Sequence, residues 1–215
     1  MKPKEEIFNL LKRLDIEAAD ELVDRLERYV EIWSRWNERV RLTSRMSTDE
    51  FIGTQLAESL LLWRLFGERG SYLDVGSGGG LPGIPIALLL RDRTVLVESN
   101  YRKAAFLNAC RRELGIGWVR VHCGRVEEID DLASLAPFRY ITARAVAPIA
   151  SILEWTIDLA DDRTTYIIPK GDKARGELDA AQELMERLGL SARIEKLTSP
   201  LKPYPYRVVV LERKR

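Results

Sequence analysis

A glycine-rich segment that follows a short apolar run carries the clearest chemical signal in this chain. Residues 72–90 read YLDVGSGGGLPGIPIALLL, with Asp74 just before the glycines and a second apolar run after them. Glycine allows positive φ angles and lets the backbone approach a ligand closely. Because open parallel sheets bind ligands beyond the carboxyl ends of their strands, we expect this segment to hold a cofactor between a strand and a helix.

Two classes of cofactor compete for this loop. Gly78, Gly80 and Gly83 satisfy the spacing G-x-G-x-x-G of dinucleotide-binding loops. A pyrophosphate, however, needs free N–H groups at the start of the helix, and Pro82 has none. The carboxylate of Asp74 would repel a diphosphate and favour a cationic cofactor such as S-adenosylmethionine, which carries a sulfonium and an ammonium group.

Charged residues near the ends of the later strands extend the expected site. Glu98 ends the run TVLVE, where an acid accepts hydrogen bonds from the ribose hydroxyls of either cofactor. In GRVEEI, Glu127 is a candidate acceptor for an adenine amine, and the Val126 N–H is a candidate donor to a ring nitrogen. Arg144 is a candidate clamp for the methionine carboxylate or an RNA phosphate, with a structural ion pair as the alternative. For Lys170, a ligand-facing and a solvated side chain are equally good interpretations.

If the cofactor is S-adenosylmethionine, the segment that follows the fourth strand indicates which kind of atom accepts the methyl group. Methyltransferases of exocyclic amines tend to place an acid or amide there, followed by prolines and an aromatic residue, whereas methylation of a pyrimidine carbon needs a cysteine nucleophile. Here the segment reads YITARAVAP, and Cys110 and Cys123 lie elsewhere. An acceptor with a free lone pair and no proton, such as guanine N7, needs no general base. Its methylation depends mainly on positioning and desolvation.

Strands and helices alternate from residue 71 onward, which indicates a doubly wound, Rossmann-like α/β domain. The expected sheet is mostly parallel and seven-stranded, with the last two strands antiparallel because only SPLKPYP joins them. The expected strands are residues 72–75, 94–98, 118–122, 139–143, 164–170, 191–198 and 206–213. The expected helices between them are residues 82–90, 100–114, 148–160 and 173–188.

The region before this domain is expected to form helices. Trp33 and Trp36 recur with other apolar residues at helical spacing, and we interpret this stripe as core rather than as a base-stacking surface. Ser47 and Glu50 have the spacing of a capping box that begins another helix, which ends before Gly67. We therefore assign residues 1–66 to a helical segment packed on the core and residues 67–215 to the cofactor-binding domain, in one compact body.

Composition narrows the function classes without choosing one. The 215 residues are 46% hydrophobic and 31% charged, and no apolar run approaches the roughly 20 residues of a membrane span. Two cysteines give neither a disulfide framework nor a metal-ligand pattern, and we expect a cytoplasmic monomer without a metal. The net charge of +1 says little about nucleic-acid binding, which depends on local patches.

Several motifs resemble, in order and spacing, those of one family of RNA-modifying enzymes. The segments are WNERVRLTS, QLAESLLL, DVGSGGGLPGIPIALL, VESNYRKAAFL, GRVEE, ARAVA and PKG. They are similar to the RsmG family, also called glucose-inhibited division protein B. The resemblance implies a class I S-adenosylmethionine-dependent enzyme that methylates N7 of a guanine in 16S rRNA, in the small-subunit loop near the decoding site. Its substrate would be free rRNA, the 30S subunit or an assembly intermediate.

The resemblance also implies roles for particular residues. Together with Asp74 and Gly78 of the loop, the cofactor contacts it implies are Gly76, Leu81, Glu98, Ser99, Asn100, Val126, Glu127 and Arg144. The basic residues that would face RNA or shape the acceptor pocket are Arg102, Lys103, Lys170 and Arg207. The expected catalytic residues, acting by position and charge rather than as general bases, are Arg144 and Lys170.

Three positions depart from the pattern of that family. Arg41 stands where the family usually has asparagine, and Gln55 and Glu58, followed by Ser59, stand where it usually has HxxDS. We expect these positions to join the N-terminal helices to the entrance of the cofactor site. Three other functions stay open at this point: a small-molecule methyltransferase, a non-catalytic protein that binds RNA and S-adenosylmethionine, and a nicotinamide oxidoreductase.

Overall fold

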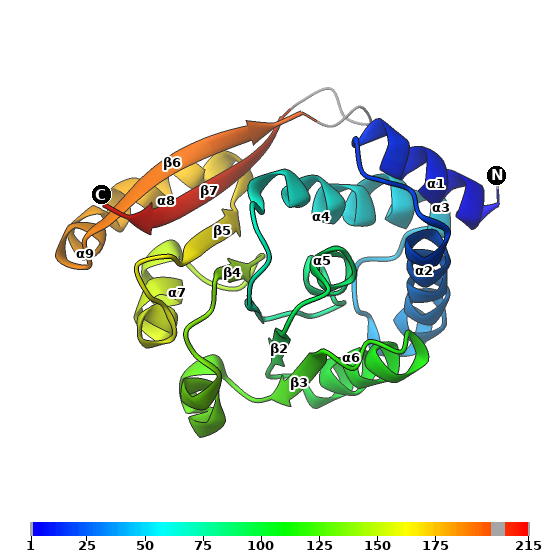
Figure 1. Cartoon of the computed structure of the whole chain (residues 1–215), viewed down its shortest axis with the longest axis horizontal. Coiled ribbons are helices and arrows are strands. Elements are labelled where there is room, and N and C mark those ends of the chain that lie inside the picture. Colours follow the sequence, from blue (N-terminus) through cyan, green and yellow to red (C-terminus); the bar gives the residue numbers. More distant parts are fainter. Residues whose placement is uncertain (1, 199–204, 215) are drawn as a thin grey trace.

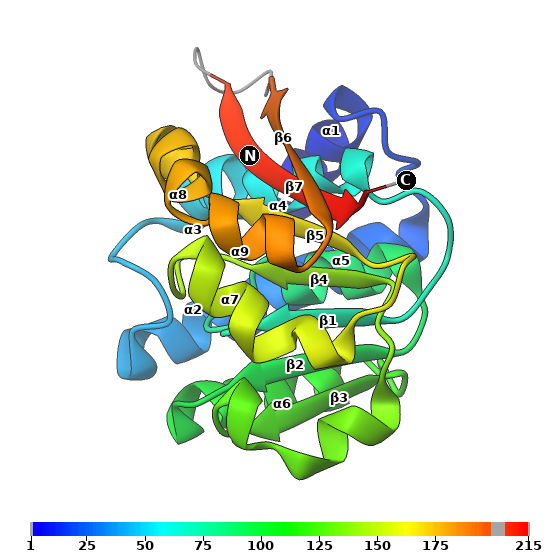
Figure 2. The ribbon, with the colours of Figure 1, turned by 90° about the vertical axis from the view of Figure 1, so that its left-hand side faces the viewer.

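A single sheet with helices on both faces forms the centre of the computed structural model, which describes residues 2–198 and 205–214. The strands are β1 (Tyr72–Val75), β2 (Thr94–Glu98), β3 (Val119–Cys123), β4 (Tyr140–Ala143), β5 (Thr165–Pro169), β6 (Leu190–Leu197) and β7 (Tyr206–Arg213). Their order in the sheet is β3-β2-β1-β4-β5-β7-β6, as Figure 2 shows from the side. β1 to β5 are parallel, and β7 is antiparallel to both β5 and β6.

This sheet confirms the seven-stranded, doubly wound fold that the alternation of strands and helices predicts. The bounds of each strand lie within one residue of the expected ones. The antiparallel pairing of the last two strands is also confirmed, although most of the link SPLKPYP lies outside the described residues. The strand order reverses between β1 and β4, so a ligand is expected at the carboxyl ends of these two strands.

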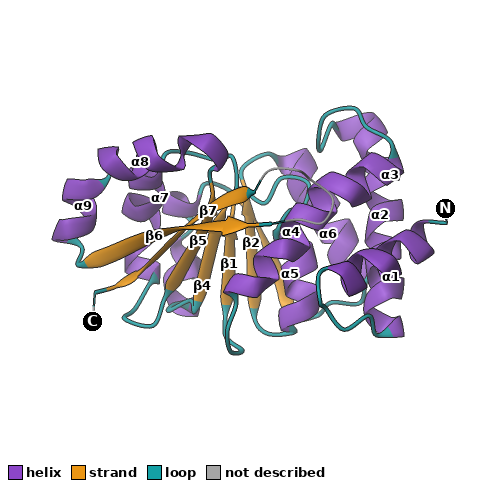
Figure 3. Cartoon of the chain, turned by 90° about the horizontal axis from the view of Figure 1, so that it is seen from above, coloured by secondary structure: helices purple, strands orange, loops and turns teal. Residues whose placement is uncertain are grey.

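Helices cover the sheet in two layers (Figure 3). One face carries α4 (Ala57–Leu61), α5 (Gly83–Leu90) and α6 (Tyr101–Glu113), and the opposite face carries α7 (Ile149–Thr156), α8 (Ala174–Ala180) and α9 (Gln182–Arg187). The N-terminal helices lie outside α5 and α6 (Figure 1) and are α1 (Pro3–Arg13), α2 (Asp20–Val40) and α3 (Thr48–Glu50). No helix in the described part of the chain is long and apolar enough to cross a membrane.

Short π- and 3₁₀-helical turns complete the elements: η1 (Phe51–Leu56), η2 (Leu62–Leu65), η3 (Val126–Glu128), η4 (Asp130–Leu135), η5 (Ile157–Leu159) and η6 (Gly171–Lys173). η1 is a π-helix, a form that is often found at functional sites. The helix expected over residues 173–188 is divided into α8 and α9. The division falls at Ala181, whose backbone, with φ −96° and ψ 0°, leaves the helical region.

The core consists of two apolar clusters, one on each face of the sheet. The N-terminal helices share the cluster on the α5 face, where the ring of Trp33 stacks on Phe51 with centroids 3.7 Å apart. Trp36 packs against Phe106 at the edge of the same cluster, so the interpretation of both tryptophans as core is confirmed. The capping box of Ser47 is also confirmed, with Glu50 bonded in return to the backbone of Ser47.

Candidate active site

The glycine-rich loop lies between β1 and α5, where the strand order reverses. Gly76, Gly78 and Gly80 have φ angles of 68°, 53° and 81°, so the positive φ expected of this loop is confirmed. A Cβ atom on Gly76 would lie 2.5 Å from Cγ2 of Val146, which follows β4. The loop therefore reaches the segment after β4 so closely that only glycine fits at position 76.

The N-terminal helices hold this loop directly. The hydroxyl of Tyr29, on α2, donates a hydrogen bond of 2.6 Å to the carbonyl of Gly79, and the Tyr29 side chain is fully buried. Leu42 and Thr43, which follow α2, lie within van der Waals contact of a Cβ built on Gly79. Sequence reasoning missed this bond. Its only signal is a tyrosine on the apolar stripe of α2, because a buried hydroxyl usually has a partner.

Glu98 connects the loop to the turn between β2 and α6. Its Oε2 accepts a hydrogen bond of 2.8 Å from the Gly78 N–H, and its Oε1 accepts one of 2.8 Å from the Asn100 N–H. The Asn100 side chain in turn caps α6 by accepting from the backbone N–H groups of Arg102 and Lys103. Since a carboxylate has about four acceptor sites, Glu98 keeps lone pairs for two hydroxyl donors. This arrangement fits the ribose of an adenosine cofactor.

The remaining candidate cofactor residues lie at the same edge of the sheet. Val126 and Glu127 form the start of η3, directly after β3, with Val126 buried and Glu127 exposed. The N–H of Gly124 donates to the carbonyl of Glu98, so this segment lies beside the end of β2. Leu81 is buried behind the glycine loop. The structure thus brings the expected ribose and adenine contacts to one side of the loop.

Asp74 does not end the first strand, as the sequence suggests, but lies within it. It is the third residue of β1, and its carboxylate points beneath the loop instead of into an open cleft. Oδ1 accepts a hydrogen bond of 2.5 Å from the Thr142 hydroxyl, and Oδ2 faces Gly83, where a Cβ would lie 2.6 Å away. Burial raises the pKa of Asp74 to about 6, with the Thr142 bond partly offsetting the effect. The expectation that Asp74 ends the strand is therefore corrected, because Val75 follows it in β1 and its buried carboxylate lies against Gly83 at the start of α5.

Arg144, just after β4, is held by Gln55 and Glu58, two of the three residues that differ from the usual pattern of the RsmG family. Its Nη2 donates hydrogen bonds of 2.8 Å to Gln55 Oε1 and 2.8 Å to Glu58 Oε2, and its Nη1 lies 3.5 Å from Ser59 Oγ. The structure therefore shows the ion pair that was the alternative interpretation of Arg144. Gln55 and Glu58 thus connect the segment before β1 to the residue that follows β4, as expected, whereas Arg41 is exposed and, in the part of the chain that the structure describes, forms no hydrogen bond with Arg144.

Lys170, just after β5, is buried and paired. Its Nζ lies 2.8 Å from Glu177 Oε2 on α8 and also donates to the Ala147 carbonyl. Glu177 accepts a further bond of 3.1 Å from the Ile149 N–H at the start of α7. The interpretation of Lys170 as a solvated side chain is therefore wrong. The lysine fixes the segments after β4 and β5 relative to α8.

A cavity of about 560 Å³ opens beside the glycine loop, between the segments that follow β4 and β5. Arg144, Lys170 and Val146 line it, so it adjoins the loop through the contact of Val146 with Gly76. Tyr206, at the start of β7, also lines the cavity, and burial raises the pKa of Tyr206 to about 12. Sequence reasoning missed this tyrosine. The volume lies within the range of small-ligand pockets.

The fold and the site define a class of enzyme. The strand order is 3-2-1-4-5-7-6 with an antiparallel seventh strand, a glycine loop follows β1, and an acid ends β2. These features define the class I S-adenosylmethionine-dependent methyltransferases. Solved structures of this class share the fold. An O-methyltransferase from Bacillus cereus in complex with SAH has a TM-score of 0.60 and 19% identity, covering 87% of this chain and 91% of that one. Cofactor-bound Rv0187 from MTB has a TM-score of 0.59 and 20% identity, covering 89% and 91%.

Sequence comparison identifies the family within this class. The model of the GidB family, rRNA small subunit methyltransferase G, matches residues 22–199. A ribosomal RNA small subunit methyltransferase G from Halorhodospira halophila is 35% identical over 188 residues, which cover 86% of this chain and 88% of the relative. One from Neisseria meningitidis serogroup C is 35% identical over 180 residues, covering 83% and 85%. The chain belongs to the GidB family, as its motifs suggest.

Proposed function

We propose that this chain methylates N7 of a guanine in 16S rRNA and takes the methyl group from S-adenosylmethionine. The observation that carries the proposal is the position of the cavity after β4 and β5, directly beside the glycine loop. Among its lining residues the only carboxylate, Glu177, is already engaged by Lys170 and the Ile149 N–H. An acceptor that carries a proton would need a free base there, whereas guanine N7 needs none.

The residues around the glycine loop suit this cofactor. Glu98 would receive the ribose hydroxyls, because two backbone amides already fix its orientation. Ser99 and Asn100 lie in the turn beside Glu98, and Val126 and Glu127 lie where the adenine would be. When bound, S-adenosylmethionine supplies a methyl group on a sulfonium centre, and guanine N7 accepts that group as the carbon–sulfur bond breaks, so no proton is transferred.

The charges around the cavity suit the product. Methylation at N7 leaves a positive charge on the purine, which an unpaired arginine or lysine would disfavour. Arg144 is paired with Glu58, and Lys170 is paired with Glu177, so both cations are balanced in place. We assign to Arg144 and Lys170 the roles of positioning the acceptor and shaping the pocket. Arg144 also remains the candidate contact for the methionine carboxylate.

The partner is the small-subunit rRNA, as the free molecule, in the 30S subunit or in an assembly intermediate. Arg102 and Lys103, at the start of α6, and Arg207, on β7, lie near the cofactor edge, where they would contact RNA. We expect the enzyme to act as a monomer. Because the substrate is ribosomal, we expect the enzyme in the cytoplasm.

Incubation of the protein with methyl-labelled S-adenosylmethionine and either protein-free 16S rRNA or 30S particles tests the proposal. Label in the RNA as 7-methylguanosine is the expected result. Binding of both ligands without release of S-adenosylhomocysteine would indicate a non-catalytic protein, and label transfer only to small molecules would indicate another methyltransferase. Calorimetric titration with NAD and with S-adenosylmethionine separates the enzyme from a nicotinamide oxidoreductase.

A further inference from the structure

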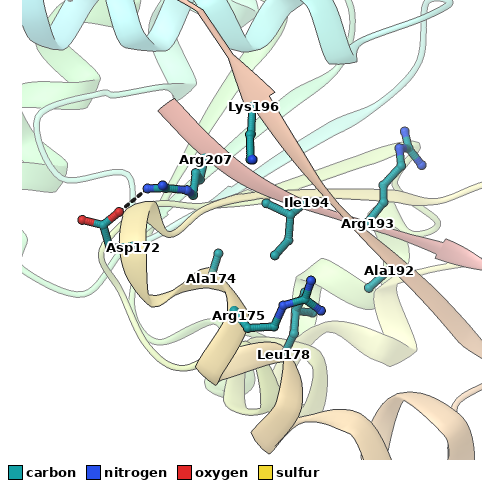
Figure 4. A pocket seen from close by; sticks show the side chains of 9 residues that line it. All are labelled: Asp172, Ala174, Arg175, Leu178, Ala192, Arg193, Ile194, Lys196 and Arg207. Carbon is teal, nitrogen blue, oxygen red and sulfur yellow. Dashed lines mark hydrogen bonds and ion pairs between the residues drawn. The ribbon is translucent and has the colours of Figure 1, made fainter. Parts of the chain in front are cut away.

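A second hollow, of about 470 Å³, lies between α8 and the β6–β7 pair. Figure 4 shows its lining, which combines apolar side chains, such as those of Leu178 and Ile194, with basic ones. Four basic side chains come from three elements around it: Arg175 on α8, Arg193 and Lys196 on β6, and Arg207 on β7. Among its lining residues only one, Asp172, carries a carboxylate.

The charges in this hollow are not balanced. Arg207 is paired with Asp172, and Arg193 is paired with Glu195 and Glu212. In the described ranges, no carboxylate forms an ion pair with Arg175 or Lys196, and both residues are exposed. These two cations are therefore available to an anion from outside the chain.

The pairing of β6 with β7 places Lys196 opposite a second basic residue. Lys196 and Arg207 are direct partners in the antiparallel register, and Figure 4 shows them side by side. Like charges directly opposite each other destabilise a sheet. Because Asp172 already balances Arg207, Lys196 is the cation of this pair that is available to an anion.

The hollow adjoins the acceptor cavity. The turn η6 separates them, with Gly171 and Lys173 lining the cavity and Asp172 lining the hollow. The N–H of Lys170 donates to the carbonyl of Arg207, so the two sites share one edge of the sheet. Lys173 lines the cavity and Arg175, two residues later, lines the hollow, so basic residues lie on both sides of this boundary.

We propose that this hollow binds the phosphate backbone of the rRNA strand next to the target guanine, with Arg175 and Lys196 as direct phosphate contacts. The inference rests on the proposed function, since it takes the acceptor cavity as the site of the guanine. It extends the RNA-binding surface to residues beyond those that the sequence motifs indicate. Because phosphate contacts carry no base information, this site positions the strand rather than selecting its sequence.

The double variant Arg175→Ala/Lys196→Ala tests the inference. The matched control is Arg111→Ala/Arg112→Ala, which removes two exposed arginines from the last turn of α6, far along that helix from the cofactor edge. Each phosphate contact to a single strand contributes about 0.7 to the slope of log affinity against log salt, so we expect the slope to fall by about 1.4. We also expect the KM for protein-free 16S rRNA to rise about tenfold, with kcat and S-adenosylmethionine affinity unchanged.

The outcomes separate this inference from the proposed function. If the wild-type protein methylates 16S rRNA but the double variant keeps the salt slope and KM of the control, the hollow does not bind the strand. A defect on 30S particles that is absent on protein-free rRNA would assign the hollow to a ribosomal protein and overturn the inference. Failure of the wild-type protein itself to methylate rRNA would instead refute the proposed function. The single variant Lys196→Gln keeps a polar side chain of similar length and should show about half of the change in slope.

Discussion

The hydroxyl of Tyr29 on α2 donates a hydrogen bond of 2.6 Å to the carbonyl of Gly79, inside the cofactor loop. Because Tyr29 is fully buried, this bond lies in the shared core of the N-terminal helices and the sheet. The N-terminal segment therefore holds the glycine-rich loop of the candidate cofactor site directly. The same segment supplies Gln55 and Glu58, which hold Arg144.

Removing the Tyr29 hydroxyl should weaken cofactor binding. In Tyr29→Phe, the Gly79 carbonyl loses its buried donor, which costs about 1–3 kcal/mol of folding free energy. The loop also loses a contact that fixes its shape, so we expect the Kd for S-adenosylmethionine to rise about fivefold to tenfold, which corresponds to roughly 1 kcal/mol. Chemical unfolding and calorimetric titration measure the two effects.

Tyr166→Phe provides the control for this variant. It removes another buried hydroxyl, which lies near Thr156 on the opposite face of the sheet. This control should lose stability while keeping its cofactor affinity. Equal affinities of Tyr29→Phe and Tyr166→Phe would show that the Tyr29 bond does not position the loop.

Replacement of Arg144 should reveal which ligand it serves. Arg144→Lys keeps the charge but loses the fork that contacts Gln55 and Glu58 together. A hydrogen bond to a charged group contributes about 1.5–3 kcal/mol, so we expect kcat/KM to fall roughly 10- to 100-fold. A rise in the Kd for S-adenosylmethionine would assign Arg144 to the cofactor, and a rise only in the KM for RNA would assign it to the acceptor. Unchanged kinetics would exclude both roles.

The half-buried ion pair of Lys170 and Glu177 predicts that stability is lost in one variant and recovered in a second. Lys170→Met leaves the Glu177 carboxylate without its cation, and because Glu177 is partly exposed, the loss of stability should lie below the roughly 3–5 kcal/mol of a fully buried pair. Adding Glu177→Gln removes the unpaired charge and keeps an acceptor for the Ile149 N–H, so most of the stability should return. Urea unfolding of both variants checks this.

The activity of the same double variant shows whether Lys170 positions the acceptor or only stabilises the fold. If Lys170 positions the acceptor, kcat stays low although stability recovers. Recovery of both stability and kcat would show that Lys170 acts only through folding.

Asp74 gives the protein a pH dependence of known sign. Its pKa is about 6 in the folded chain, above its ordinary value of 3.8, because the carboxyl group is buried. The folded state thus binds a proton more readily than the unfolded state, so the contribution of this group to stability is full below about pH 4 and is lost as the pH rises through 6. Relative to Asp74→Asn, the wild-type protein should therefore be more stable at pH 5 than at pH 8. If the free energies of unfolding of the two proteins change with pH in the same way, the raised pKa of Asp74 is contradicted.

Local patterns were sufficient to predict much of this structure from the sequence. The alternation of strands and helices, the glycine loop and the capping box at Ser47 each depend on residues close together in the chain. Asp74 was misplaced because β1 ends at Val75, so that Asp74 faces α5 instead of ending the strand. The break at Ala181 has no turn residue to signal it.

The contacts that define the site were harder to predict. Tyr29 and Gly79 are 50 residues apart, and Glu58 and Arg144 are 86 apart. Spacing within one element carries no information on such pairs, which depend on how the N-terminal helices pack against the sheet. The pairing of Lys170 with Glu177 likewise depends on the placement of α8 beside the end of β5.

The most direct test of the whole account is a methylation map of 16S rRNA from cells that lack this protein. Mass spectrometry of rRNA fragments should show one guanine without its N7-methyl group, and the group should return when the wild-type gene is restored. Restoration with the Arg175→Ala/Lys196→Ala variant should return it only in part. An unchanged methylation map of 16S rRNA in the deletion strain would contradict the proposed function.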